Sequence, residues 1–178
     1  MAIALSPGRI PAAPAAAMDP PPAKPSPAQT AHIVAFARYP GGGIDALVSW
    51  LMSQGARVTV VPLSYLPLDW FDHYASSYDV ALVEGAFVGD DGAVIDFGLR
   101  LRRFAPDLPV IMVSSRIAAS DYSTERMAIC DVTLKSPAQT IDLLEALAAA
   151  LENHAYWRDT RAQGRLLLPR KRPPAPPG

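Results

Sequence analysis

The sequence has few of the residues that crosslink a fold or span a membrane. Among its 178 residues Cys130 is the only cysteine, which excludes an intramolecular disulfide and a four-cysteine zinc site. No apolar run approaches the roughly 18 residues that a membrane-spanning helix needs. The length instead fits one ordinary domain of about 100–200 residues with additional tails.

Excess charge of one sign is also lacking, because the formal net charge is only -1. The charges are nevertheless unevenly distributed. Residues 31–155 hold 8 Lys/Arg and 15 Asp/Glu, a net of -7, whereas residues 156–178 hold 6 basic residues and one acidic residue, a net of +5. We expect an acidic body whose basic C-terminal segment can contact the body itself or an acidic partner, and we do not expect nucleic-acid binding.

Proline marks both ends of the chain, since 13 of the 19 prolines lie in residues 1–30 or 169–178. Proline fixes φ and removes a hydrogen-bond donor, which disfavours helices and sheets. We therefore predict a disordered Pro/Ala-rich tail over 1–30, a folded domain over 31–155, and a helix extension followed by a basic Pro-rich tail over 156–178. The N-terminal segment lacks the continuous apolar core of a signal peptide. Residues 170–176 match RxxPxxP, a polyproline ligand pattern.

Between the tails, short apolar runs alternate with helical patterns. The runs predict strands, over residues 32–37, 58–61, 79–83, 109–113 and 132–134. The helical patterns cover residues 43–54, 64–76, 94–104, 119–128 and 137–152. This (βα)5 order predicts a flavodoxin-like α/β three-layer sandwich with a five-stranded parallel sheet.

Two helices allow a prediction of which side is buried. In the last helix the expected buried stripe is Ile141, Leu144, Leu147 and Leu151. In the helix over 94–104, Arg102 is expected on the solvent side with its neighbouring arginines.

Ligand sites of open parallel sheets lie at the carboxyl ends of the strands. The residues expected there are Ala37, Arg38, Glu84, Ser114, Ser115 and Lys135. Gly41–Gly43 lacks the full pattern of a phosphate-binding loop, so it is interpreted as a loop and helix start, with a nucleotide or flavin site left open. Asp90 and Asp91 are interpreted as turn or cap residues and Cys130 as a small packed side chain. The three histidines have no ligand-like spacing, and no metal site is expected.

The residues at the strand ends resemble a known family. YDVALVE, then DDG, then LRRFAPDLPVIMVSS, then Leu134–Lys135, resemble the receiver domain of bacterial two-component response regulators over about residues 31–153. Glu84 to Ser114 is 30 residues and Ser114 to Lys135 is 21 residues, close to the intervals usual in that family. The resemblance implies a phosphoaccepting aspartate on the third strand, an acidic pair that helps to hold Mg²⁺ after the first strand, and a Ser/Thr and a lysine that bind the phosphoryl oxygens.

The sequence departs from that family pattern at the decisive positions. Glu84 stands at the phosphoacceptor position, Ala37–Arg38 replaces the acidic pair, and Val132 replaces the usual aromatic residue on the fifth strand. We therefore predict a degenerate pocket without metal, cofactor or catalysis. In it Glu84 would form an ion network with Lys135 and Arg38. Whether Glu84 imitates a phosphorylated aspartate or is only a remnant stays open.

The resemblance implies a cytoplasmic signalling protein that acts through a protein partner: a sensor kinase, another regulator or an output protein. The candidate interface residues are Val132, Tyr156 and Trp157, although docking of Tyr156 and Trp157 on their own domain is the favoured interpretation of those two. A homodimer through the face made by the fourth helix, fifth strand and fifth helix is a further expectation. Two alternatives remain open. One is a receiver that a kinase still modifies on Glu84 or Ser114, and the other is a small flavodoxin-like nucleotide or flavin binder.

Overall fold

The structure is a computed structural model, and it describes residues 30–62 and 68–164. Nearly all of the predicted N-terminal tail and the whole RxxPxxP segment lie outside these ranges. Within them no helix combines the length and the apolar character that crossing a membrane would require.

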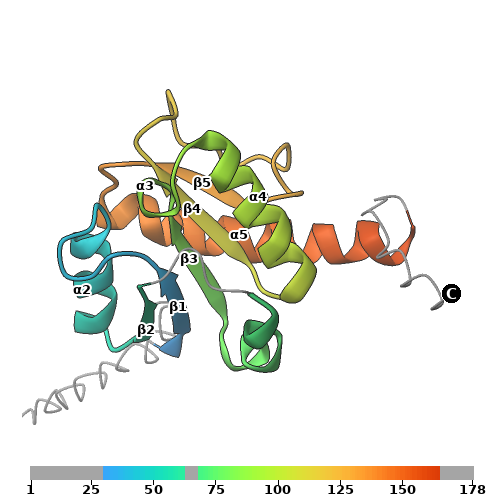
Figure 1. Cartoon of the computed structure of the whole chain (residues 1–178), viewed down its shortest axis with the longest axis horizontal. Helices are drawn as coiled ribbons and strands as arrows, with labels where there is room; N and C mark the ends of the chain where they lie inside the picture. The colour runs from blue at the N-terminus through green and yellow to red at the C-terminus, as the bar shows by residue number, and fades with distance from the viewer. Residues whose placement is uncertain (1–29, 63–67, 165–178) are drawn as a thin grey trace, which may run out of the picture.

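All five predicted strands are present and form one parallel sheet (Figure 1). They are β1 His32–Phe36, β2 Arg57–Val61, β3 Val80–Glu84, β4 Val110–Ser114 and β5 Val132–Lys135. The order across the sheet is β2-β1-β3-β4-β5. Because β3 lies in the middle and all five of its residues are buried, its carboxyl end is the centre of the sheet edge where a site is expected.

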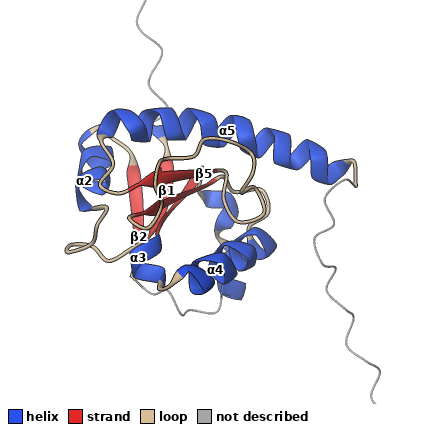
Figure 2. Cartoon of the chain, turned by 90° about the horizontal axis from the view of Figure 1, so that it is seen from above, coloured by secondary structure: helices blue, strands red, loops and turns tan. Residues whose placement is uncertain are grey.

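Helices cover both faces of the sheet, which confirms the predicted flavodoxin-like three-layer architecture. Helices α2 Asp45–Ser53 and α5 Thr140–Ala162 contribute to one apolar core, and α4 Asp91–Phe104 contributes to the other. Figure 2 shows α5 and α4 on opposite sides of the strands. The short helix α3 Gly85–Val88 follows β3 directly.

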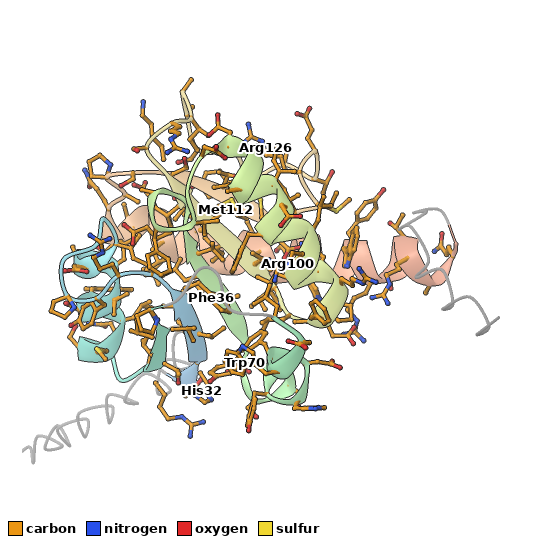
Figure 3. All side chains as sticks on the ribbon, viewed as in Figure 1. His32, Phe36, Trp70, Arg100, Met112 and Arg126 are labelled. Atoms are coloured by element: carbon orange, nitrogen blue, oxygen red, sulfur yellow. The ribbon has the colours of Figure 1, made fainter. Side chains whose placement is uncertain are left out.

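Aromatic side chains build much of the core on the α4 side. The ring of Phe36, labelled in Figure 3, packs edge-on against Phe71 and Phe97 with centroids 5.4 and 5.2 Å away. Phe71 belongs to the 3₁₀ segment η1 Leu68–His73, which is followed by η2 Ala75–Ser77. The predicted α-helix over 64–76 is therefore wrong where the structure describes it, since residues 68–77 form 3₁₀ turns and residues 63–67 are not described.

The predicted helix over 119–128 is also wrong. Asp121 instead forms an isolated antiparallel bridge with Thr133 of β5, with N···O distances of 2.7 and 2.9 Å. The Asp121 side chain accepts a hydrogen bond from the Ser123 N–H at 2.9 Å. Such local side-chain bonds compete with helix formation, and this segment is rich in residues that make them.

Helix α5 buries a different stripe from the predicted one. Its buried residues are Leu143, Ala146, Leu147, Ala150, His154 and Trp157. Ile141 and Leu151 are 56% and 44% exposed, so only Leu147 of the predicted set is fully buried. The helix carries two apolar stripes. The stripe that faces the sheet includes alanines and a histidine, which a search for large aliphatic residues overlooks.

Candidate functional site

Glu84 ends the central strand β3, and only 6% of its surface is exposed. Its Oε2 accepts a hydrogen bond from the backbone N–H of Arg38 at 3.3 Å. Its Oε1 accepts one from the backbone N–H of Gly43. The loop between β1 and α2 therefore holds both oxygens of this buried carboxylate.

A second carboxylate orders the same loop. Asp45, in the first turn of α2, accepts hydrogen bonds from the N–H groups of Gly41 and Gly42 at 2.6 and 3.1 Å. Successive backbone N–H groups of this kind form a site suited to an anion. Here the chain fills the site with its own carboxylates, so four loop N–H groups are already paired.

The glycines allow the loop to approach Glu84 closely. A Cβ on Gly42 would lie 2.1 Å from the backbone oxygen of Arg38 and 2.7 Å from Glu84 Oε2. A Cβ on Gly43 would lie 3.0 Å from Glu84 Oε1. Gly42 and Gly43 therefore pack directly against the Glu84 carboxylate. The sequence predicted only a loop and helix start for this glycine run.

The predicted ion network is wrong for the described residues, because no ion pair joins Glu84 to Lys135 or to Arg38. Lys135 Nζ instead donates to the backbone oxygen of Ala118 at 2.7 Å. Ser114 Oγ accepts from the N–H of Arg116 at 3.2 Å. Although β3, β4 and β5 are adjacent, Ser114 and Lys135 both bond to the segment after β4. Glu84 bonds to the loop after β1.

The residues around Glu84 do not fit a magnesium ion. Ala37 is buried and has no ligand atom, and Arg38 brings a cation to the position of an expected ligand. Both oxygens of Glu84 already accept hydrogen bonds. Across residues 30–62 and 68–164 no group of three or more His, Cys, Asp or Glu side chains is arranged to hold a metal ion. A small hollow of about 150 Å³ remains beside the loop, lined by Arg38, Gly41, Gly42, Gly43, Glu84, Ala86 and Phe87.

Two of the three candidate interface residues are buried within the domain. Val132 is 1% exposed and Trp157 is fully buried, whereas Tyr156 is 56% exposed. In this conformation neither Val132 nor Trp157 presents its side chain to a partner, and Trp157 docks on its own domain. Trp157 faces inward because it belongs to the buried stripe of α5.

Two other sequence interpretations are confirmed. Asp90 is the N-cap of α4, and its side chain accepts a hydrogen bond from the Ala93 N–H at 2.8 Å. Cys130 is buried, and burial raises the pKa of its thiol. A thiol of this kind packs as a small apolar group and does not act as a nucleophile.

Sequence reasoning missed a buried ionic cluster at the opposite end of the sheet. Arg102 of α4 is fully buried, although the sequence places it among solvent-facing arginines. Its Nη2 lies 2.7 Å from Asp131 Oδ1, and its Nη1 lies 3.1 Å from His154 Nδ1. The guanidinium also stacks over the Trp157 ring, 5.1 Å from the centroid.

Backbone groups complete the cluster. Asp131 Oδ2 accepts from the Val110 N–H at 2.7 Å, and Arg102 donates to the backbone oxygens of Met127 and Leu108 at 3.1 and 3.3 Å. A buried ion pair persists only when hydrogen bonds satisfy its remaining atoms, and these bonds do so for Arg102 and Asp131. Among the described residues, His154 Nε2 and Trp157 Nε1 have no hydrogen-bond partner. The one available sequence signal was the position of Asp131 directly before an apolar strand.

The fold is one that response-regulator receiver domains share. No protein-family model matches the sequence, and no curated protein matches it significantly. Solved structures show the likeness. The receiver domain of the sensor histidine kinase PA1611 from Pseudomonas aeruginosa, which was solved with a magnesium ion in its active-site cleft, superposes with a TM-score of 0.51 at 19% identity. The match covers 69% of this chain and 98% of that one.

Two further receiver domains agree. One from Clostridium thermocellum has a TM-score of 0.54 at 19% identity, covering 71% of this chain and 98% of that chain. A CheY-like receiver from Methanospirillum hungatei has a TM-score of 0.51 at 17% identity, with the same coverage. Identities this low show the shared fold, and function must be argued from the site.

Proposed function

We propose that this chain is a receiver-like signalling protein of the two-component type that acts by binding protein partners and does not depend on phosphorylation. The partner would be a sensor kinase, another regulator or an output protein in the cytoplasm. One observation carries the proposal: both oxygens of the buried Glu84 carboxylate, at the acceptor position, accept hydrogen bonds from the loop that follows β1.

This geometry works against phosphoryl transfer for two reasons. Each Glu84 oxygen accepts a backbone N–H bond, which draws negative charge away from that oxygen and makes it a weaker nucleophile. Transfer also depends on cations that offset the charge developing on the phosphoryl oxygens. The Ala37 side chain contributes no metal ligand, and Lys135 Nζ donates to the backbone oxygen of Ala118 in the segment after β4.

The same contacts explain how the pocket can keep a fixed shape without a modification. A carboxylate that accepts two N–H bonds connects the end of β3 to the start of α2, as an anionic ligand would. The N–H groups of Gly41 and Gly42 are bonded to Asp45, and those of Arg38 and Gly43 to Glu84, so these four are not available to a nucleotide phosphate. Binding a nucleotide or flavin here is therefore the less favoured function.

The test is a titration of the purified full-length protein with Mg²⁺ and beryllofluoride, followed by amide NMR. Beryllofluoride substitutes for a phosphoryl group on a receiver carboxylate. We expect no saturable shifts at Glu84, Ser114 or Lys135, and no gain of one phosphoryl mass with a small phosphodonor.

An active receiver domain run in parallel provides the positive control for both reagents. Saturable shifts at the three positions, or a phosphoryl adduct that Glu84→Gln or Ser114→Ala removes, would overturn the proposal. Such a result would mean that the pocket still senses a phosphoryl group.

A further inference from the structure

The outer face of α5 carries an apolar stripe that is mostly exposed, although its first residue, Leu144, packs in part against the core. Leu144, Ala148, Leu151 and Ala155 recur at intervals of four, three and four, which places them on one side of a helix. Leu151 is 44% exposed, and Ala148 and Ala155 are also exposed. Figures 1 and 2 both show that the helix continues beyond the sheet toward its carboxyl end.

A row of carboxylates runs beside this stripe. Glu145, Glu152 and Asp159 are spaced seven residues apart, so they lie two helical turns from one another on the same side. All three are exposed, and none forms an ion pair with a residue in the described part of the chain. The face therefore combines apolar contact area with three negative charges.

The carboxyl-terminal part of the stripe borders a large open hollow of about 680 Å³. Its lining residues are Asp107, Ala155, Arg158, Asp159, Arg161 and Ala162. Ala155 and Ala162 leave room there for larger apolar side chains, and the other four lining residues are charged. A segment that places leucines in the hollow could continue along the acidic row.

The sequence that follows α5 has this composition. Residues 165–178, RLLLPRKRPPAPPG, contain three consecutive leucines, then Arg170, Lys171 and Arg172, with Arg165 as a fourth cation. They begin directly after Gly164, whose φ of +68° is the left-handed conformation at which chains leave a helix at an angle. The reach of this segment and the positions of its cations can therefore be compared with the positions of the hollow and the acidic row along α5.

We propose that the C-terminal segment 165–178 binds back along the exposed face of α5, antiparallel to the helix. An extended chain advances roughly 3.3 Å per residue, so Leu166–Leu168 reach about 7–13 Å from Gly164. Along the helix, at 1.5 Å per residue, Asp159 and Ala155 lie about 8–14 Å from Gly164. The leucines thus reach the hollow.

In this antiparallel arrangement the basic residues of the segment lie beside the acidic row of α5. Arg170 to Arg172 reach roughly 20–26 Å from Gly164 in an extended chain. Glu152 and Glu145 lie about 18 and 29 Å back along α5, which brackets that reach. Four cations against three carboxylates give the complementarity that fixes the register of the segment.

A second copy of the chain fits this face less well. An antiparallel α5–α5 pair would bring the row containing Glu145 and Glu152 against the same row of the other copy. Like charges at such positions are destabilising, whereas the segment 165–178 carries the opposite charge. A partner that binds the α5 face would then have to displace the segment.

Paramagnetic relaxation in the full-length protein tests this proposal independently of the phosphoryl pocket. A spin label is attached at Ala175→Cys, because the buried Cys130 with its raised thiol pKa does not compete for the reagent. We expect loss of most amide signal intensity around Glu145 and Leu151. An unbound segment would instead broaden signals only near Gly164, and that result would overturn the proposal.

Charge reversal provides the matched control. With the label in place, Glu145→Lys together with Glu152→Lys should restore the α5 signals, whereas Glu125→Lys, at an exposed residue outside α5, should leave the broadening intact. Equal effects of the two changes would contradict the proposed register. A further sample mixes isotope-labelled protein without a spin label with spin-labelled protein at natural isotope abundance. Broadening that persists in this mixture would assign the contact to a second copy and overturn the intramolecular proposal.

Discussion

Glu84 carries a buried carboxylate, and within residues 30–62 and 68–164 its partners are backbone N–H groups and no cationic side chain. Hydrogen bonds to a charged group are stronger than those between neutral groups, which is why a carboxylate tolerates burial at this position. The same bonds make the loop after β1 dependent on one side chain. A change that keeps the shape of Glu84 but removes its charge tests that dependence.

Glu84→Gln should destabilise the protein by about 1–3 kcal/mol, because the new amide group would direct a donor at a backbone donor and leave it unsatisfied. Urea unfolding measures this loss as a lower midpoint with an unchanged slope. Asp45→Asn is the matched control, since Asp45 also accepts two loop N–H bonds but is only half-buried, so that water can replace them. An equal or larger loss in Asp45→Asn would contradict the role assigned to Glu84.

The sequence located Glu84 at a strand end but not its partners. Its position follows from the apolar run of β3, because a parallel sheet exposes the residue after such a run at its carboxyl edge. Charge alone suggested Lys135 and Arg38 as partners. The actual partners are backbone groups, and which N–H groups a glycine-rich loop presents depends on its backbone path, which residue types do not encode.

At the scale of elements, the close contact between α4 and the segment before β5 depends on a helical glycine. A Cβ on Gly98 would lie 2.7 Å from the Cβ of Ile129 and 2.8 Å from its backbone oxygen. Gly98 therefore allows the irregular segment to rest directly on α4. Apolar periodicity predicts the strands and most of their helices. It does not predict the irregular segment before β5, because side chains that bond to the local backbone favour turns there over a weak helical pattern.

Gly98→Ala should destabilise the protein by about 1–3 kcal/mol, because the added methyl overpacks a contact formed partly by backbone. Gly92→Ala is the control in the same helix. Its Cβ would meet only Asp90 Oδ1, at an ordinary 3.4 Å, so this change should be neutral or stabilise by roughly 0.4–1 kcal/mol. Thermal unfolding of both variants provides the comparison. Similar midpoints would contradict the proposed close packing.

At the scale of the whole molecule, the Arg102 cluster connects the two helical layers around the edge strand β5. Arg102 belongs to α4 on one face, whereas His154 and Trp157 belong to α5 on the other, and Asp131 directly precedes β5. The two apolar cores are otherwise separated by the sheet. This connection fixes α5 at the edge of the sheet where β4 and β5 begin.

Arg102→Met should destabilise the protein by about 3–5 kcal/mol, because it leaves Asp131 buried without its cation. Arg103→Met, at the neighbouring exposed arginine, should stay within roughly 0.5 kcal/mol of the parent. Chemical unfolding of both variants measures the difference.

A double variant separates the ion pair from packing. Adding Asp131→Asn to Arg102→Met should recover part of the lost stability, since the uncompensated charge is then removed. Additive losses from the two substitutions would show that the pair is not coupled, contrary to the 2.7 Å contact.

The carboxylate of Glu84 is covalently part of the polypeptide, and that fact determines how long its effect can last. A phosphoryl group on a carboxylate is lost by hydrolysis, so a signal that depends on it lasts only as long as that bond. A tethered side chain is present at a high effective concentration for as long as the chain exists. The duration of any output that depends on this loop would therefore be set by synthesis and proteolysis of the protein.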